Sequence, residues 1–84
     1  SNIRNYKRTK PKNQINNSSH IIVLQENNQV NDNQEDVLIT LDYESLSLQS
    51  TEIISDSTVV GLSVFEDSIY FGYRDRRVQK YKDI

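Results

Sequence analysis

His20 is the only histidine of the 84-residue chain, and histidine is the side chain best suited to acid–base chemistry at neutral pH. Ser18 and Ser19 precede it, so the catalytic arrangement to consider is the Ser–His–Asp triad of a hydrolase. The Gly-x-Ser-x-Gly turn that exposes a catalytic serine does not occur in the sequence. We therefore expect His20 to have a surface or capping role, and we expect no catalytic residue and no enzyme activity.

The sequence also lacks the residues and spacings that bind a metal or a cofactor. The chain has no cysteine, which excludes zinc-finger and iron–sulfur sites. A calcium loop starting at Asp32 needs glycine at its sixth position and glutamate at its twelfth, where Val37 and Tyr43 stand. Gly61 and Gly72 lie too far apart for a phosphate-binding loop, and inside strands they mark a bulge or a close backbone approach. We expect no metal and no cofactor.

Basic residues are the strongest candidates for a binding role, and they lie at the two ends of the chain. Residues 1–12 carry five cations and no acid, residues 13–73 carry ten acids and no Lys or Arg, and residues 74–84 carry five cations and two acids. Such ends can fold back on the acidic middle or bind another acidic surface. The candidate interaction residues are Arg4, Lys7, Arg8, Lys10, Lys12, Arg74, Arg76, Arg77, Lys80 and Lys82.

Two observations bear on what these cations bind. The run from Lys7 to Lys12 is typical of a nuclear-localisation signal or a nucleic-acid-binding arm. Tyr6 is the only aromatic residue near it, so base stacking is poorly supplied, and the sequence pI of about 5.2 also argues against nucleic acid. A solubilising tail, a targeting or protein contact, and nucleic-acid binding all remain open for the first cluster. In the second cluster, Lys80 and Lys82 are expected to share one face of a charged edge strand.

Strands are the elements expected to position these residues. Residues 1–19 are polar and basic, which predicts a flexible, Asn-rich arm. Residues 20–36 are expected to form a short strand over 20–25 and an exposed, acidic Asn/Gln-rich loop over 26–36. Residues 37–84 are expected to form an antiparallel β meander, because apolar residues alternate with polar ones and no stretch shows a helical stripe.

The meander is expected to be made of short strands joined by tight turns. Turns are predicted at 55–57, at 66–67 and at 74–76, each rich in Asp, Ser or charged residues. The fold class is therefore all-β, with neighbouring strands paired antiparallel. The predicted buried face comprises Ile39, Leu41, Val60, Leu62, Val64 and Ile69.

This succession of strands resembles a β-propeller of the WD40-repeat type. Asp75 falls at the family's turn aspartate and Tyr81 near its tryptophan, whereas Asp56-Ser57 stands where the family has Gly-His, and Leu41 stands at the tryptophan position of the preceding repeat. The resemblance implies that 37–42 and 46–54 are the third and outer strands of one repeat, and that 59–65, 67–73 and 74–83 are the first three strands of the next.

The resemblance also implies a function. A propeller needs about 4–8 blades of roughly 40–45 residues, so a chain of this length would be a fragment or a segment of a larger assembly. The chain begins at Ser1 and has no Met, which agrees with this expectation. We expect a non-catalytic protein–protein interaction module, or part of a larger β-propeller scaffold. The alternative is a small nucleic-acid-associated β protein that binds through its basic arm and its basic C-terminal hairpin.

The expected partner is therefore another protein or the remainder of a longer parent chain. It would cover apolar residues that the polar first third cannot cover, among them Ile54, Val59, Phe65 and Phe71. No membrane association is expected, because the longest apolar run, at 21–24, is far below the roughly 20 residues of a membrane span. No signal-peptide pattern is found, so we expect an intracellular location, cytoplasmic or nuclear.

Overall fold

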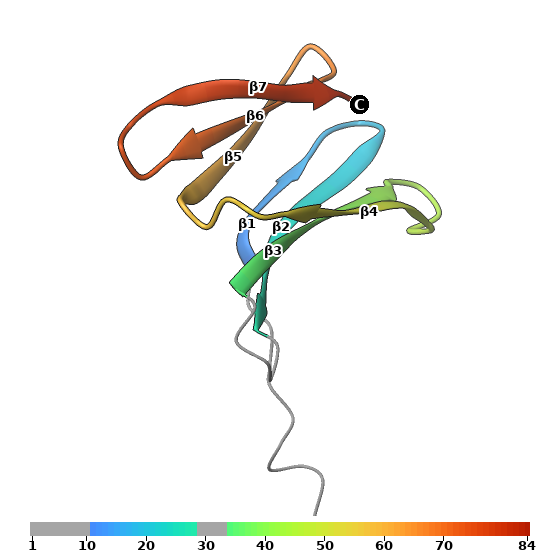
Figure 1. The fold of residues 1–84 in the computed structure, drawn as a ribbon. Coiled ribbons are helices and arrows are strands. Elements are labelled where there is room, and N and C mark those ends of the chain that lie inside the picture. The colour runs from blue at the N-terminus through green and yellow to red at the C-terminus, as the bar shows by residue number, and fades with distance from the viewer. Residues whose placement is uncertain (1–10, 29–33) are drawn as a thin grey trace, which may run out of the picture.

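The computed structural model describes residues 11–28 and 34–84, and this part of the chain is built from strands without any helix (Figure 1). All paired strands run antiparallel, which confirms the predicted all-β antiparallel fold class. A membrane-crossing helix, which would have to be long and apolar, is absent from the described residues. The strands are β1 (Pro11–Asn16), β2 (His20–Asn28), β3 (Gln34–Asp42), β4 (Leu48–Ile54), β5 (Val59–Phe65), β6 (Ser68–Tyr73) and β7 (Val78–Asp83).

The strands form two sheets instead of one continuous meander. Sheet A has the order β1-β2-β3-β4 and sheet B the order β5-β6-β7, so each sheet follows the order of the chain. The predicted meander breaks after β4, because β4 and β5 do not pair. Between them the Asp56 carboxylate accepts a hydrogen bond from the N–H of Thr58 at 2.9 Å, and this turn sends the chain into the other sheet.

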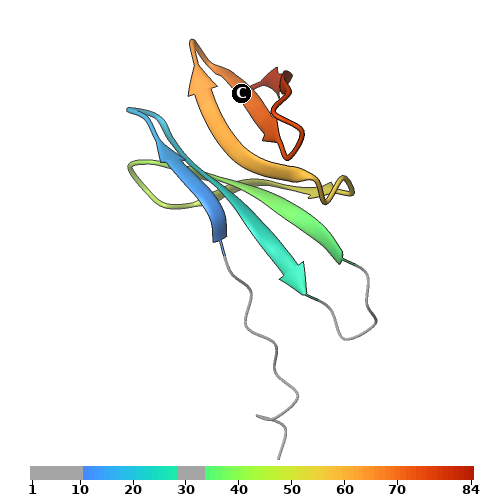
Figure 2. The same ribbon diagram turned by 90° about the vertical axis from the view of Figure 1, so that its left-hand side faces the viewer.

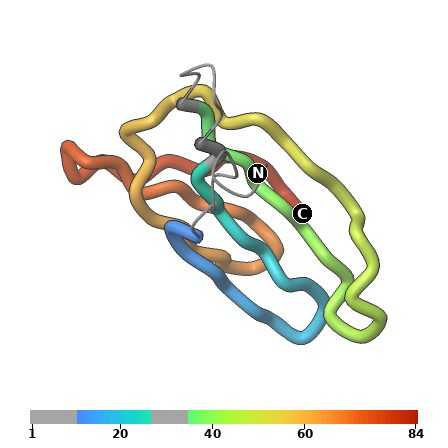
Figure 3. The backbone as a smooth tube through the Cα atoms, turned by 90° about the horizontal axis from the view of Figure 1, so that it is seen from below, coloured from blue at the N-terminus to red at the C-terminus, as the bar shows by residue number. Residues whose placement is uncertain are grey.

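The two sheets pack face to face, with the first strands of both sheets side by side (Figures 1 and 2). β5 lies against β1, where the Lys12 ammonium donates to the Val59 carbonyl at 2.8 Å. β7 lies over β4, where the Tyr81 hydroxyl donates to Glu52 Oε1 at 2.6 Å. Seen from below, the link after β4 returns the chain from one edge of sheet A to the opposite edge (Figure 3).

The core lies between the facing sheets. Leu24 and Leu38 are opposite each other in the β2–β3 register, and both are fully buried. Phe71 of sheet B is 2% exposed and stacks on Tyr81, with ring centroids 4.6 Å apart. Each sheet thus covers the inner face of the other. The buried apolar residues are Ile22, Leu24, Leu38, Ile54, Val59, Leu62, Ile69 and Phe71.

Burial of Ile54, Val59 and Phe71 inside the chain corrects the expectation that another polypeptide covers them. Sheet A covers Val59 and Phe71 of sheet B, and Ile54 of sheet A is buried in the same core. Two strands of sheet A, β1 and β2, come from the polar first third that was expected to supply no cover. Phe65, the fourth residue expected to be covered by another polypeptide, is 64% exposed on the outer side of sheet B and has no such cover from the described residues.

The arm predicted over residues 1–19 is wrong for Pro11–Asn16, which form β1. Ile15 lies opposite Ile22 and packs against the core, so one isoleucine and the backbone pairing suffice to add a polar strand to the sheet. Asn17 then closes the turn, because its side-chain oxygen accepts the N–H of His20 at 2.7 Å. The predicted arm before residue 11 lies outside the described residues.

The strand at 20–25 is longer than predicted and is paired on both sides. β2 runs to Asn28 and β3 begins at Gln34, so most of the described part of the loop predicted over 26–36 is strand. Asp36 is only 4% exposed there, and Lys12 supplies its counter-charge at 2.7 Å. Residues 29–33 of that predicted loop are not described.

The predicted buried face is only partly correct. Leu62 and Ile69 are buried, but Val60 is 46% exposed because a bulge between β5 and β6 shifts the alternation there. Ile39, Leu41 and Val64 are half-buried. The alternating apolar residues of β3 lie on the face turned away from sheet B, because the register turns the face that carries Asp36, Leu38 and Thr40 toward sheet B. The predicted turns at 66–67 and 74–76 are confirmed.

Candidate functional site

The structure separates the predicted basic residues into different roles. Lys12 is an internal link, because its ammonium forms an ion pair with Asp36 at 2.7 Å and donates to the Val59 carbonyl at 2.8 Å. These contacts join β1, β3 and β5 and leave the ammonium unsuited to an external ligand. Four further candidates lie outside the described residues: Arg4, Lys7, Arg8 and Lys10.

The C-terminal hairpin keeps the other candidates together. Arg77 pairs with Asp75 at 3.2 Å and lies over the ring of Tyr73, 4.3 Å from its centroid. The N–H of Arg77 holds the pKa of the Asp75 carboxyl below its ordinary value. In the described part of the chain, the side chains of Arg74 and Arg76 form no hydrogen bond or ion pair, so the hairpin tip presents two uncompensated cations.

Lys80 and Lys82 do not share the face predicted for them. A register shift between β6 and β7 places Lys80 opposite Tyr70 but Lys82 opposite Ile69, on the other face. Lys80 pairs with Asp83 at 2.9 Å, and this partner raises the pKa of the Lys80 ammonium. The hairpin is therefore less positive than its sequence indicates.

Lys82 and Tyr81 converge on Glu52 of β4. The Lys82 ammonium lies 2.5 Å from Glu52 Oε2, and the Tyr81 hydroxyl donates to Oε1 at 2.6 Å. Burial raises the pKa of Glu52, but these two hydrogen bonds outweigh burial and lower it below its ordinary value. Burial and the bond to Glu52 raise the pKa of Tyr81 to about 12. This cluster is a structural link between the sheets.

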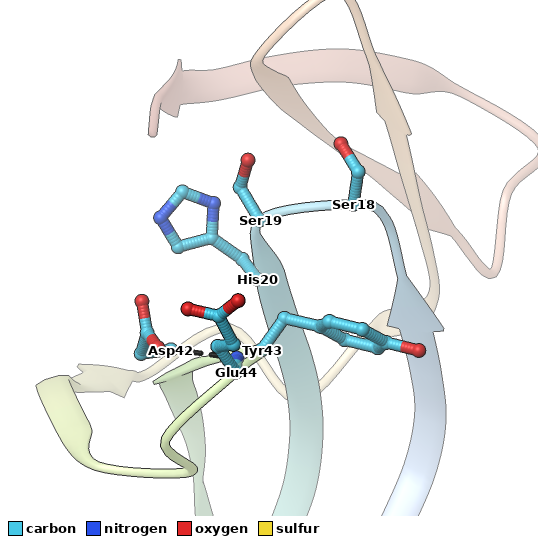
Figure 4. A pocket seen from close by; sticks show the side chains of 6 residues that line it. All are labelled: Ser18, Ser19, His20, Asp42, Tyr43 and Glu44. Atoms are coloured by element: carbon cyan, nitrogen blue, oxygen red, sulfur yellow. Dashed lines mark hydrogen bonds between the residues drawn. The ribbon is translucent and has the colours of Figure 1, made fainter.

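The residues weighed for Ser–His–Asp chemistry do come together, at an open hollow of about 410 Å³ (Figure 4). His20 lies opposite Asp42 in the β2–β3 register. The Oδ2 atom of Asp42 instead accepts the N–H of Ser45 at 2.9 Å and its hydroxyl at 3.0 Å, and these bonds lower the pKa of Asp42. The hollow is lined by Ser18, Ser19, His20, Asp42, Tyr43 and Glu44.

This geometry does not supply a catalytic triad. Within residues 11–28 and 34–84, no hydrogen bond joins the imidazole of His20 to a serine hydroxyl or to Asp42, and its Nδ1 atom is shielded from solvent without a partner. A triad requires the aspartate to orient the histidine and the histidine to contact the nucleophile. No group of three or more metal-binding side chains occurs in the described residues either.

The most extensive unassigned surface is the outer face of sheet A, which faces away from sheet B. Its central rows follow from the register: Ile21 pairs with Leu41, and Val23 with Ile39. Polar residues occupy the same face on β1, at Gln25 of β2 and Glu35 of β3 near one end of the sheet, and at Thr51 of β4. The aliphatic members of this outer face of sheet A are Ile21, Val23, Val37, Ile39, Leu41, Leu48 and Ile53.

These aliphatic side chains are only partly covered. Ile53 is 55% exposed and Leu48 is 63% exposed, whereas the residues on β2 and β3 are half-buried by their neighbours in the sheet. Among the described residues no element packs on this aliphatic sheet face, which makes it a candidate surface for another protein element. The alternation of Val37, Ile39 and Leu41 carries this signal in the sequence, although alternation alone predicts a core position for Ile39 and Leu41.

The outer face of sheet B is smaller and contains both glycines. Gly61 of β5 lies opposite Gly72 of β6, and Gly72 lies opposite Val78 of β7. In this row across the three strands, Val78 is therefore the one residue with a side chain. Val78 is 67% exposed. Ser63 and Tyr70 form the next row.

Comparison of the chain with protein-family models, with curated proteins and with solved structures finds no match. The functional argument therefore rests on the arrangement of the two sheets, on their outer faces and on the basic hairpin.

Proposed function

We propose that the chain is a non-catalytic protein-interaction module that forms two successive blades of a larger β-propeller scaffold of the WD-repeat type. Its partners are further β-sheets, from the remainder of a longer parent chain or from another protein. The observation that carries the proposal is the connection from β4 to β5, which leaves one edge of sheet A and enters sheet B against β1 at the opposite edge.

This connectivity supports the proposal because it makes the two sheets equivalent. In both sheets the strands follow one another in chain order, beginning at the edge where Lys12 of β1 bonds to Val59 of β5. A propeller places its blades in the same way, around an axis beside the first strands. A further sheet could stack on sheet B as sheet B stacks on sheet A.

The outer faces supply the second support. A two-sheet protein that works alone buries its apolar residues between its sheets and turns polar residues outward. Sheet A instead carries aliphatic residues on both faces, such as Leu38 inside and Ile39 outside. The two residues on which the resemblance to the family rests make contacts within sheet B: the Asp75 carboxylate accepts the N–H of Arg77 in the β6–β7 turn, and Tyr81 stacks on Phe71.

Dye binding tests whether the outer face of sheet A is an interaction surface. The variant Val23→Thr/Ile39→Thr replaces two aliphatic residues of this face by a strand-forming polar residue. We expect a fluorescent hydrophobic dye to bind the wild-type chain and to bind this double variant several-fold more weakly, with unchanged far-ultraviolet circular dichroism. Gln14→Thr, on the same face of β1, is the matched control and should bind the dye like the wild type. Equal dye binding by wild type and double variant would contradict the proposal.

Nucleic-acid binding is the competing function, and Arg74 and Arg76 at the hairpin tip are the observation that favours it. Fluorescence anisotropy with a labelled duplex and a labelled single strand separates the two functions. The proposal predicts weak binding that is unchanged in Arg74→Gln/Arg76→Gln. Tight binding that weakens steeply with salt and is lost in that variant would establish the nucleic-acid alternative.

A further inference from the structure

The glycine pair on the outer face of sheet B has no explanation inside the chain. Neither glycine has a positive φ, so the backbone does not require glycine at 61 or 72. A Cβ atom at Gly61 would meet nothing within 4 Å, and one at Gly72 would meet only the Cα atom of Gly61, at 3.9 Å. Packing among the described residues therefore does not require glycine either, although glycine weakens a strand.

A bulge lies between Val59 and Gly61, but a bulge requires glycine only where its φ is positive, which is not the case here. Close approach of another element is the remaining physical reason for a glycine pair in these strands. The pair is a cross-strand pair, so it leaves a patch of bare backbone with Val78 on one side and the Ser63–Tyr70 row on the other. Because side chains flank this bare backbone, the patch is a shallow depression in the sheet face, and it can accept a protruding side chain or a strand of a second sheet.

The packing of sheet A on sheet B indicates which strand approaches. β1 contacts the inner side of β5 closely enough for Asn13 Nδ2 to reach the Leu62 carbonyl at 3.4 Å. Gly61 lies on the opposite side of this same strand. A sheet that stacked on sheet B in the way that sheet B stacks on sheet A would bring its own first strand against Gly61.

We propose that the outer face of sheet B, centred on Gly61 and Gly72, binds the outer face of sheet A of a second copy of this chain. This inference rests on the proposed function, because it treats the second copy as the next blade of the stack. The first strand of the copy passes over the glycine pair, and aliphatic residues such as Val23 and Ile39 pack toward Tyr70 and Val78.

The chemistry of the two faces is compatible. The central rows of sheet A's outer face are uncharged, from Gln14 and Val23 across to Ile39 and Thr51. On sheet B, Lys80 of this face is paired with Asp83. The unpaired cations Arg74 and Arg76 lie at the adjoining hairpin tip, beyond the Gly72–Val78 row. The interface centred on the glycine pair therefore desolvates no unpaired charge as long as it leaves this tip in solvent.

The symmetry of such an interface is heterologous, because two different faces meet. Heterologous contacts leave one free copy of each face at the ends, so association continues into rings or open arrays. The wild-type chain should accordingly form species beyond the dimer, and blocking either face should leave monomers.

Sedimentation velocity with two blocked variants tests the proposal. Gly61→Val fills the depression on sheet B without a clash inside the chain, and Val23→Thr/Ile39→Thr alters sheet A. At concentrations up to about 500 µM, which suits an interface at the small end of the specific range, the wild type should associate. Each variant alone should associate at least about tenfold more weakly. An equimolar mixture of the two should form a dimer and nothing larger, since each supplies one intact face.

Folding and specificity are controlled in the same series. Gly61→Ala adds a smaller side chain at the same site and should weaken association less than Gly61→Val, while far-ultraviolet circular dichroism reports that both fold. A monomeric wild type, association unaffected by Gly61→Val, or a mixture that stays monomeric would each overturn the inference. If the wild type is monomeric while dye binding still depends on Val23 and Ile39, the proposed function stands and this inference fails.

Discussion

Replacing Lys12 by methionine should destabilise the fold strongly. The substitution keeps the apolar stem of the side chain but removes the ammonium that pairs with Asp36 at 2.7 Å and donates to the Val59 carbonyl at 2.8 Å. The Asp36 carboxylate, whose side chain is 6% exposed, would then be buried without a counter-charge.

The expected loss follows from the cost of an unpaired buried charge. Removing one partner of a buried ion pair typically costs about 3–5 kcal/mol. Native domains have a free energy of unfolding of roughly 0.05–0.15 kcal/mol per residue, so for 84 residues the total is on the order of 4–13 kcal/mol. The variant should therefore lose roughly a quarter of its stability or more.

Urea unfolding followed by far-ultraviolet circular dichroism, at a dilution that keeps copies apart, measures this loss. The double variant Lys12→Met/Asp36→Leu removes both charges and should recover most of it. Lys80→Met is the matched control, because the Lys80–Asp83 pair is exposed and screened by solvent, so its loss should leave the urea midpoint nearly unchanged. A Lys12→Met variant within about 1 kcal/mol of the wild type would refute the reasoning.

Three further changes have defined outcomes. Leu62→Ala, at a side chain 6% exposed between the sheets, should cost about 2–5 kcal/mol in the same unfolding assay, and a loss below about 0.5 kcal/mol would show that Leu62 is not in the core. The pKa of Tyr81 is raised to about 12, so its stabilising bond to Glu52 is intact below pH 10 and is lost as the pH rises through 12. The difference in phenolate absorbance between the wild type and Tyr81→Phe should show this late titration, and a midpoint near 10.0 would contradict it. Glu66 and Asp67 both have positive φ, so Glu66→Asn/Asp67→Gly should stabilise the β5–β6 turn by roughly 0.4–1 kcal/mol, and a lower urea midpoint would contradict this.

The all-β class and the turns could be predicted because their signals are local. Alternation of apolar residues along 37–43 and the Glu66-Asp67 and Arg74–Arg76 segments each depend on neighbouring residues alone. β1 could not be predicted from composition, since it contains one apolar residue of the aliphatic or aromatic kind, Ile15. Its place depends on pairing with β2 and on the Lys12–Asp36 contact, which joins residues 24 positions apart.

The choice of buried face failed for a related reason. Strand β3 has apolar residues on both faces, so alternation alone does not say whether Leu38 or Ile39 faces the other sheet. The interaction residues were also hard to predict, because a lysine that binds an outside partner and one that pairs internally look alike in sequence. Lys12 and Lys82 pair with acids on other strands, whereas Arg74 and Arg76 project from the hairpin.

The central claim is that the outer faces of the two sheets are surfaces on which the sheets of a second copy of this chain pack. Nitrogen-15 correlation spectra of the labelled chain, recorded with increasing amounts of unlabelled chain, test it residue by residue. We expect concentration-dependent shifts of the amides of Val23 and Ile39 on sheet A and of Gly61 and Gly72 on sheet B. Spectra that superimpose at every concentration, or shifts confined to the hairpin around Arg76, would contradict the claim.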